Sequence, residues 1–290
     1  MKRRAILIGS PSYKENGDYL SGVKTDIENM YSFLRSSIGG SWQKEEIKYF
    51  YPNVDWSKIT TYLEDVKSAD MSFIYFSGHG FRDFNERDQI VLNRNENIDI
   101  HKNLVNLSKH QITIIDACRS YPQYHSFDGI PTLEGIIFPD PDPEYARYLY
   151  NKQLLTIENS KVLLNATEKG TSAIDIGSDY GGLFSNVLLQ VAKSVIHSKE
   201  KPVFTVFEIF NKAKYQVEKI QKNQKPVIST TKNEQQALSL PFAINPNNTQ
   251  ILELKKQNKN DEINEVFKGL AITAGVVGGI FLIGKLFNGK

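Results

Sequence analysis

"YFSGHG" at residues 75–80 and "IIDACRS" at residues 114–120 each contain an apolar run that stops abruptly at polar residues. The first run leads into a histidine between two glycines, and the second leads into Cys118, the only cysteine of the chain. Short and fully apolar runs are typical of strands buried in a parallel sheet. Ligands of an open parallel sheet bind beyond the carboxyl ends of its strands. His79 and Cys118 are therefore the first candidates for chemistry.

The patterns on both sides of these runs alternate between strand and helix. Strands are expected at residues 5–8, 47–51, 71–76, 112–115, 161–164 and 225–229, with a short one at 90–92, and helices at 24–34, 57–69, 183–195 and 203–220. This alternation predicts an α/β fold with a mostly parallel sheet flanked by helices in three layers. The proline-rich residues 120–150 are expected to form a long surface loop.

Length and composition indicate one large domain with appendages. The chain has 290 residues, of which 40% are hydrophobic and 23% charged, with a net charge of +2. We expect a domain over residues 1–245 and no nucleic-acid partner, because no general positive charge would attract one. A single cysteine forms no internal disulfide, and the apolar run at 5–8 is too short for a signal peptide. The domain is expected in the cytoplasm.

The C-terminal end differs in composition from the rest. Residues 246–268 are rich in Asn, Lys and Glu and predict a polar tether, and residues 269–287 predict a single apolar helix. At 1.5 Å per residue the helix is about 24 Å long up to Gly284 and about 28 Å up to Phe287, against a hydrocarbon core of roughly 30 Å. The helix is expected to anchor the domain to a membrane, whether it spans, lies on or perforates the bilayer. The alternative is a core helix docked on the domain.

Two glycines in this apolar segment stand four residues apart, Gly275 and Gly279. Small residues at this spacing let two apolar helices approach closely in a membrane. The segment is therefore a candidate surface for self-association.

The chemistry expected of His79 and Cys118 follows from their residue types. A cysteine nucleophile needs a base to form the thiolate, and a histidine at the end of the neighbouring strand can supply one without a metal. Strand alternation places Asp116 and Cys118 on the same side of the sheet. Taken alone, a cysteine is most often a small buried residue and a histidine is usually structural. Their shared position after two apolar strands favours the functional interpretation.

Several motifs, in this order, resemble the caspase and metacaspase superfamily of cysteine peptidases. They are "RRAILIG" at 3–9, "LSGVKTD" at 20–26, "YFSGHG" at 75–80, "DACRS" at 116–120, and "NATEKGTSAIDIGSDYGGLFSNVLLQ" at 165–190. The match runs from about residue 3 to about residue 245. Ser185 stands where threonine is commoner in the superfamily. The resemblance implies a caspase-like sheet.

The resemblance also implies a role for each site residue. Cys118 attacks the scissile carbonyl, and His79 protonates the leaving amine and later activates water. The backbone amides of Gly80 and Cys118 form the oxyanion hole. Asp26 and Asp116 bind an Arg or Lys side chain of the substrate, as paired carboxylates suit a cation. The alternative for these acids is that Asp26 faces solvent and Asp116 caps a strand end.

The acidic calcium cluster of some metacaspases has no clear counterpart, although Asp83, Asp88, Asp99 and Asp128 lie in the corresponding loops. We therefore expect no cofactor, and calcium activation is undecided. Arg119 serves either substrate or structure.

The expected function is that of a membrane-tethered cysteine endopeptidase that cleaves proteins or peptides after Arg or Lys, in cell death or defence. One alternative is an inactive module that keeps the fold for signalling or interaction. Another is a membrane-disrupting effector, in which the peptidase domain releases the apolar tail. Arg147 and Lys152 are candidate sites of self-cleavage in the stretch from Tyr121 to Lys152.

Overall fold

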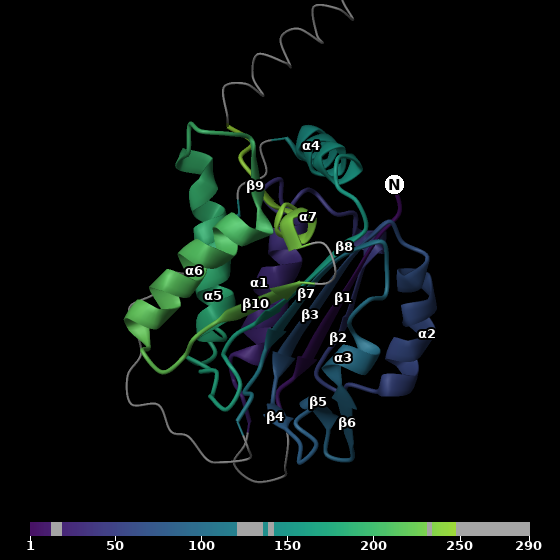
Figure 1. Ribbon diagram of the computed structural model, residues 1–290, viewed down its shortest axis with the longest axis vertical. Coiled ribbons are helices and arrows are strands. Elements are labelled where there is room, and N and C mark those ends of the chain that lie inside the picture. The colour runs from purple at the N-terminus through teal and green to yellow at the C-terminus, as the bar shows by residue number, and fades with distance from the viewer. Residues whose placement is uncertain (13–18, 121–135, 139–141, 231–233, 248–290) are drawn as a thin grey trace, which may run out of the picture. The chain divides into compact units, whose positions relative to one another are not determined.

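A computed structural model describes residues 1–12, 19–120, 136–138, 142–230 and 234–247 (Figure 1). Contacts between residues divide the chain into two units, Met1–Pro246 and Asn247–Lys290. Nearly all of the expected tether and the whole of the expected apolar helix at 269–287 lie outside the described residues. Within those ranges, no helix has both the length and the apolar character needed to cross a bilayer.

The core of the first unit is a sheet in which six of the described strands take part. The strands β2 (Ile47–Phe50), β1 (Arg3–Ser10), β3 (Met71–Gly78), β7 (His110–Asp116), β8 (Ser160–Asn165) and β10 (Val227–Thr230) lie side by side in that order. All neighbours are parallel except β10, which runs antiparallel to β8. The predicted mostly parallel sheet is confirmed. β3 and β7 are buried along their whole length, because the sheet is covered on both faces.

Helices cover the two faces of this sheet (Figure 1). On one face, α2 (Trp56–Lys67) and α3 (Ile100–Asn103) share a core cluster with side chains such as Ile74 and Phe76 of β3. On the other face lie α1 (Val23–Arg35), α5 (Leu183–Ser194) and α6 (Val206–Ile220), where Tyr75 of β3 reaches Ser185 of α5. The alternation of β3 side chains between two apolar layers explains why its sequence is apolar at nearly every position.

Shorter elements complete the unit. The strands β4 (Gly80–Arg82), β5 (Asp88–Asn93) and β6 (Glu96–Asp99) form an antiparallel sheet directly after β3, where the sequence predicted only a short strand. β9 (Val203–Thr205) pairs with β11 (Pro241–Ile244), and η1 (Lys44–Glu46), η2 (Val195–His197) and α7 (Glu234–Leu238) are short helical segments. The helix expected from residue 203 begins instead at Val206, because Thr205 and Glu208 form a capping box there.

The expected loop at 120–150 is wrong over its last part, which begins the helix α4 (Pro143–Leu155). The prolines of this stretch predict a surface loop, but a proline fits the first turn of a helix, where its missing N–H costs nothing. Asp142 caps α4 by accepting a hydrogen bond from the Tyr145 amide at 3.0 Å. Arg147 ties the helix to the rest of the unit, since its guanidinium donates to Glu46 Oε1 at 2.6 Å and to Oε2 at 2.7 Å.

Candidate active site

His79 and Cys118 lie beyond the same end of two neighbouring strands. In the parallel pairing of β3 with β7, Ser77 is the partner of Asp116. His79 follows Ser77 by two residues, and Cys118 follows Asp116 by two residues. Adjacent strands are about 4.8 Å apart. The structure therefore brings both residues to one edge of the sheet, each with a half-buried side chain.

The backbone around His79 depends on its flanking glycines. Gly78 has a φ of +154°, and a Cβ at this position would overlap the carbonyl oxygen of Ser10. A Cβ at Gly80 would lie 2.8 Å from both the Cβ of Ala117 and the carbonyl oxygen of Cys118. The Gly-His-Gly segment thus packs directly against the segment that carries the cysteine. Both expected oxyanion donors, the amides of Gly80 and Cys118, belong to these two touching segments.

The Cys118 thiol is held by a hydrogen bond and by its burial. Its sulfur donates a hydrogen bond of 3.5 Å to the carbonyl oxygen of Ala173. Burial raises the pKa of the Cys118 thiol, and the nearby charge of Asp116 acts in the same direction. A thiol with a raised pKa is a weak nucleophile at neutral pH. Reaction requires that a base remove this proton.

Asp26 and Asp116 come together on the α1 and α5 side of the sheet, and neither faces solvent. Asp26, in α1, is 3% exposed and accepts hydrogen bonds from the Ser77 hydroxyl at 2.6 Å and the Gly182 amide at 2.8 Å. Asp116, the last residue of β7, is 5% exposed and accepts one from the Ser185 amide at 3.0 Å. The alternative that Asp26 is a solvent-facing residue is wrong.

Two consecutive glycines pack directly against the two acids. A Cβ at Gly181 would overlap the Asp26 carboxylate, and a Cβ at Gly182 would overlap the Asp116 carboxylate. The backbone of residues 181–182 therefore occupies the space beside both acids. A larger side chain at either glycine would displace a carboxylate of the pair.

The acid pair is electrostatically unfavourable when both groups are ionised. Burial raises the pKa of Asp116 to about 6. Burial and the neighbouring charge of Asp116 hold the pKa of Asp26 well above its usual value. The phenol of Tyr75, which shares a 2.7 Å hydrogen bond with the Ser185 hydroxyl, has its pKa raised by burial and by the same two acids. Such a cluster of perturbed groups beside a cysteine and a histidine is typical of a functional site.

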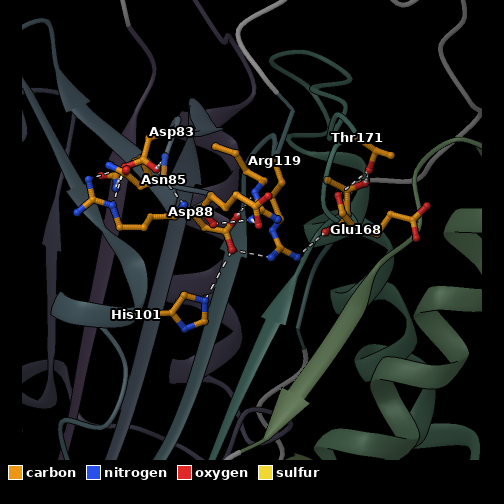
Figure 2. A network of polar contacts seen from close by, with 12 residues as sticks. Asp83, Asn85, Asp88, His101, Arg119, Glu168 and Thr171 are labelled. Atoms are coloured by element: carbon orange, nitrogen blue, oxygen red, sulfur yellow. Dashed lines mark hydrogen bonds and ion pairs between the residues drawn. The ribbon is translucent and has the colours of Figure 1, made fainter.

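Arg119, which follows Cys118, faces another buried acid. Its guanidinium donates to Asp88 Oδ2 at 2.6 Å and to the carbonyl oxygen of Thr167 at 3.3 Å. Figure 2 shows Asp88 between Arg119 and His101, whose Nε2 lies 3.7 Å from Asp88 Oδ2. Burial opposes the charge of Asp88, but His101 and the arginines Arg119 and Arg82 outweigh burial and lower its pKa. Arg119 is therefore engaged within the protein.

The acidic residues of the calcium loops are also engaged, so far as they are described. Asp83 accepts hydrogen bonds from the Arg87 guanidinium at 2.8 Å and the Gln89 amide at 3.2 Å. Asp99 caps α3 by accepting one from the Lys102 amide at 3.0 Å, and Asp128 lies outside the described residues. Over the part of the chain that the structure describes, no three His, Cys, Asp or Glu residues gather as a metal site.

Sequence reasoning missed two features of this site. The first is the Gly181–Gly182 segment, which contacts both acids although Gly182 lies 156 residues after Asp26. The second is the pairing of Arg119 with Asp88. The consecutive glycines at 181–182 were the only local signal of the first, and nothing local to either residue predicted the second.

Comparison with known proteins identifies the family and the fold. The family model described as the caspase domain matches residues 2–238. Among solved structures, caspase-1 from Spodoptera frugiperda is similar, with a TM-score of 0.50 and 12% sequence identity over 79% of this chain and 86% of that chain. At this identity the likeness concerns the fold. No curated protein matches the chain.

Proposed function

Because the chain belongs to the caspase domain family, we propose that it is a cysteine endopeptidase with Cys118 as the nucleophile and His79 as the general acid and base. The observation that carries this proposal is the position of both residues two places beyond the register pair Ser77 and Asp116. The close packing of Gly80 against Ala117 and Cys118 supports it, because the segment of one residue is in contact with the segment of the other.

The reaction needs these groups in sequence. His79 takes the proton of the Cys118 thiol, and the sulfur forms a bond to the scissile carbonyl carbon. The proton then goes to the leaving amine as the peptide bond breaks. His79 next removes a proton from water, whose oxygen bonds to the acyl carbon as the carbon–sulfur bond breaks. His79 returns the proton to the sulfur, so the acid product leaves and the thiol is restored. The amides of Gly80 and Cys118 are suited to stabilise the developing oxyanion, a contribution of about 3 kcal/mol in comparable sites.

We propose further that the substrate residue before the cleaved bond is Arg or Lys. Asp26 and Asp116 are two buried carboxyl groups that accept hydrogen bonds from hydroxyl and amide groups of the protein. A guanidinium or ammonium would satisfy both with charge-assisted bonds and would favour their ionised forms.

The test is a cleavage assay with the full-length chain and short peptides that end in Arg, Lys or Asp before a reporter group, with and without calcium. We expect cleavage after Arg and Lys that is lost in Cys118→Ala. Cleavage after Asp alone would reverse the assignment of the acid pair. The absence of any Cys118-dependent cleavage would favour a non-catalytic module with the caspase fold.

We propose that the domain lies in the cytoplasm and is held at a membrane by residues 269–287, with a role in cell death or defence. The support is the composition of that segment and of the polar residues 246–268 before it. Gly275 and Gly279 give the segment a surface suited to pairing with a second copy.

A further inference from the structure

Arg119 is fixed by contacts from several parts of the chain. Its side chain is 5% exposed, and its guanidinium contacts Asp88 and Thr167 at the distances given above. Its backbone N–H donates to the Thr171 carbonyl at 2.9 Å, and its carbonyl accepts from the Gly170 amide at 2.9 Å. The position of this residue also determines the position of Cys118, because the two are consecutive.

Asp88 belongs to the strand that holds the backbone of His79. It begins β5 and is the partner of Arg82 in β4, and in the same ladder Ile90 is the partner of Gly80. The next residue, Val91, donates its amide hydrogen to the carbonyl oxygen of His79 at 2.9 Å. The ion pair between Asp88 and Arg119 therefore connects the hairpin that carries His79 to the segment that carries Cys118.

The ion pair of Asp88 with Arg119 is expected to add little to the free energy of unfolding. Both side chains are buried, and neither Asp88 Oδ1 nor Arg119 Nε has a hydrogen-bond partner. The remaining charged or titratable neighbours of Asp88 are farther away, Arg82 Nε at 3.9 Å and His101 Nε2 at 3.7 Å. Replacing a buried ion pair of this kind by apolar residues is often neutral or stabilising. What the pair supplies is a fixed distance between two segments.

We propose that Asp88 and Arg119 are positioning residues, which hold the Cys118 thiol within reach of the His79 imidazole. The inference rests on the proposed function, since it assigns these residues to the same cysteine and histidine. Arg119 then has no contact with substrate, which decides between the two roles that the sequence left open.

The test uses the single cysteine of the chain. Iodoacetamide alkylates only Cys118, and its rate as a function of pH reports how readily the thiolate forms. In the full-length chain we expect a His79-dependent reactivity at pH 6–7 that His79→Ala abolishes. Asp88→Asn should lower this rate by roughly 10- to 100-fold, because small displacements of paired groups cost that much. On a cleavable peptide, kcat should fall by a similar factor with KM changed by less than about threefold.

Asp88→Asn leaves Arg119 buried without its acid, so loss of folding is a competing explanation. The double variant Asp88→Leu/Arg119→Met replaces the pair by apolar side chains and should unfold no more easily than the original chain. We expect it to fold and to show the same loss of His79-dependent alkylation. The matched control is Asp83→Asn on the same hairpin, since Asp83 contacts Arg87 and Gln89 rather than the cysteine segment. It should alkylate at the original rate.

Three results would overturn the proposal. The first is alkylation of Cys118 in the double variant at the rate of the original chain. The second is alkylation of the original chain that does not depend on His79. The third is unfolding of both Asp88 variants, which would mean that the ion pair is needed only for folding. Failure of the peptidase proposal can be distinguished from failure of the positioning proposal, because alkylation of Cys118 needs no substrate. A chain that cleaves no peptide but loses His79-dependent alkylation on Asp88→Asn refutes the peptidase and keeps the positioning pair.

Discussion

Buried acids in this protein fall into two groups according to their neighbours. Asp88 and Glu46 each contact an arginine, and although burial opposes their charge, the arginines lower their pKa values. Asp26 and Asp116 accept hydrogen bonds from hydroxyl and amide groups, and burial raises their pKa values. An arginine of a substrate would stabilise the ionised forms of Asp26 and Asp116, as Arg119 stabilises the ionised form of Asp88. This contrast between acids of one protein supports a basic substrate residue.

Because the pKa of Asp116 is raised, ionisation of this buried carboxyl group should destabilise the folded chain as the pH rises. The group binds its proton more tightly in the folded state than in the unfolded state, whose Asp pKa is about 4. Its contribution to stability is therefore complete below about pH 4 and is lost as the pH rises to about 6. The loss is on the order of 3 kcal/mol.

Asp116→Asn should remove this dependence. The measurement is the free energy of unfolding by urea of the full-length chain at pH 4 and pH 6.5, with and without the substitution. The free energy of unfolding of the variant, relative to that of the original chain, should be higher at pH 6.5 than at pH 4. Titrating groups remote from Asp116 cancel in this difference. Asp26 loses the neighbouring charge that raises its pKa, which favours the variant in the same direction. Equal differences at the two pH values would therefore contradict the raised pKa of Asp116.

The strands of the sheet and the helices that cover it were predictable because each follows one periodicity. The apolar runs at 71–76 and 112–115 correspond to β3 and β7, and the helix expected at 183–195 is α5 within one residue. α4 was missed, since its initial proline resembles a loop signal in the absence of tertiary context. The contact of Gly182 with Asp26 was not predictable, because it joins residues 156 positions apart.

The packing of Gly182 against the acid pair can be tested by substitution. Gly182 has φ −73° and ψ 139°, which alanine adopts without strain, so a substitution acts only through the overlap of its Cβ with Asp116. Gly182→Ala should lower the free energy of unfolding by about 1–3 kcal/mol. The cost should shrink in an Asp116→Ala background, which removes the overlapping carboxylate. Thermal unfolding of the four proteins of this cycle measures the coupling, and additive effects would exclude the contact.

Helix α4 changes the expectation for self-cleavage. Arg147 and Lys152 lie within α4, and Arg147 makes two bonds to Glu46. Cleavage there requires local unfolding of the helix, which these contacts oppose. We expect mass spectrometry of the incubated full-length chain to show no fragments that begin at Tyr148 or Gln153, whereas Cys118-dependent cuts elsewhere remain compatible with the structure. Fragments with those N-termini, absent in Cys118→Ala, would show that α4 opens in solution.

At the scale of the molecule, the residues assigned to chemistry all belong to the unit Met1–Pro246. The six-stranded sheet, its two helical layers and the acid pair are complete within that unit. The argument for a membrane has a separate source, the apolar composition of residues 269–287. Peptidase activity and membrane attachment are therefore expected to be separable, and a truncation tests this directly.

A chain that ends at Asn247 should keep the peptidase activity and no longer bind membranes. Its kcat/KM on a soluble peptide should stay within about threefold of the full-length value, because the truncation leaves the acid pair and both strand ends intact. In flotation with phosphatidylcholine vesicles, the full-length chain should rise with the lipid and the truncated chain should stay at the bottom.

A truncated chain that still floats would place the membrane contact in the domain. One that fails to fold would support the docked core helix, since an anchor in lipid contributes nothing to the packing of the sheet. In cells, a toxicity that disappears with the tail while peptide cleavage persists would identify the apolar segment as the effector and the peptidase as the means of its release.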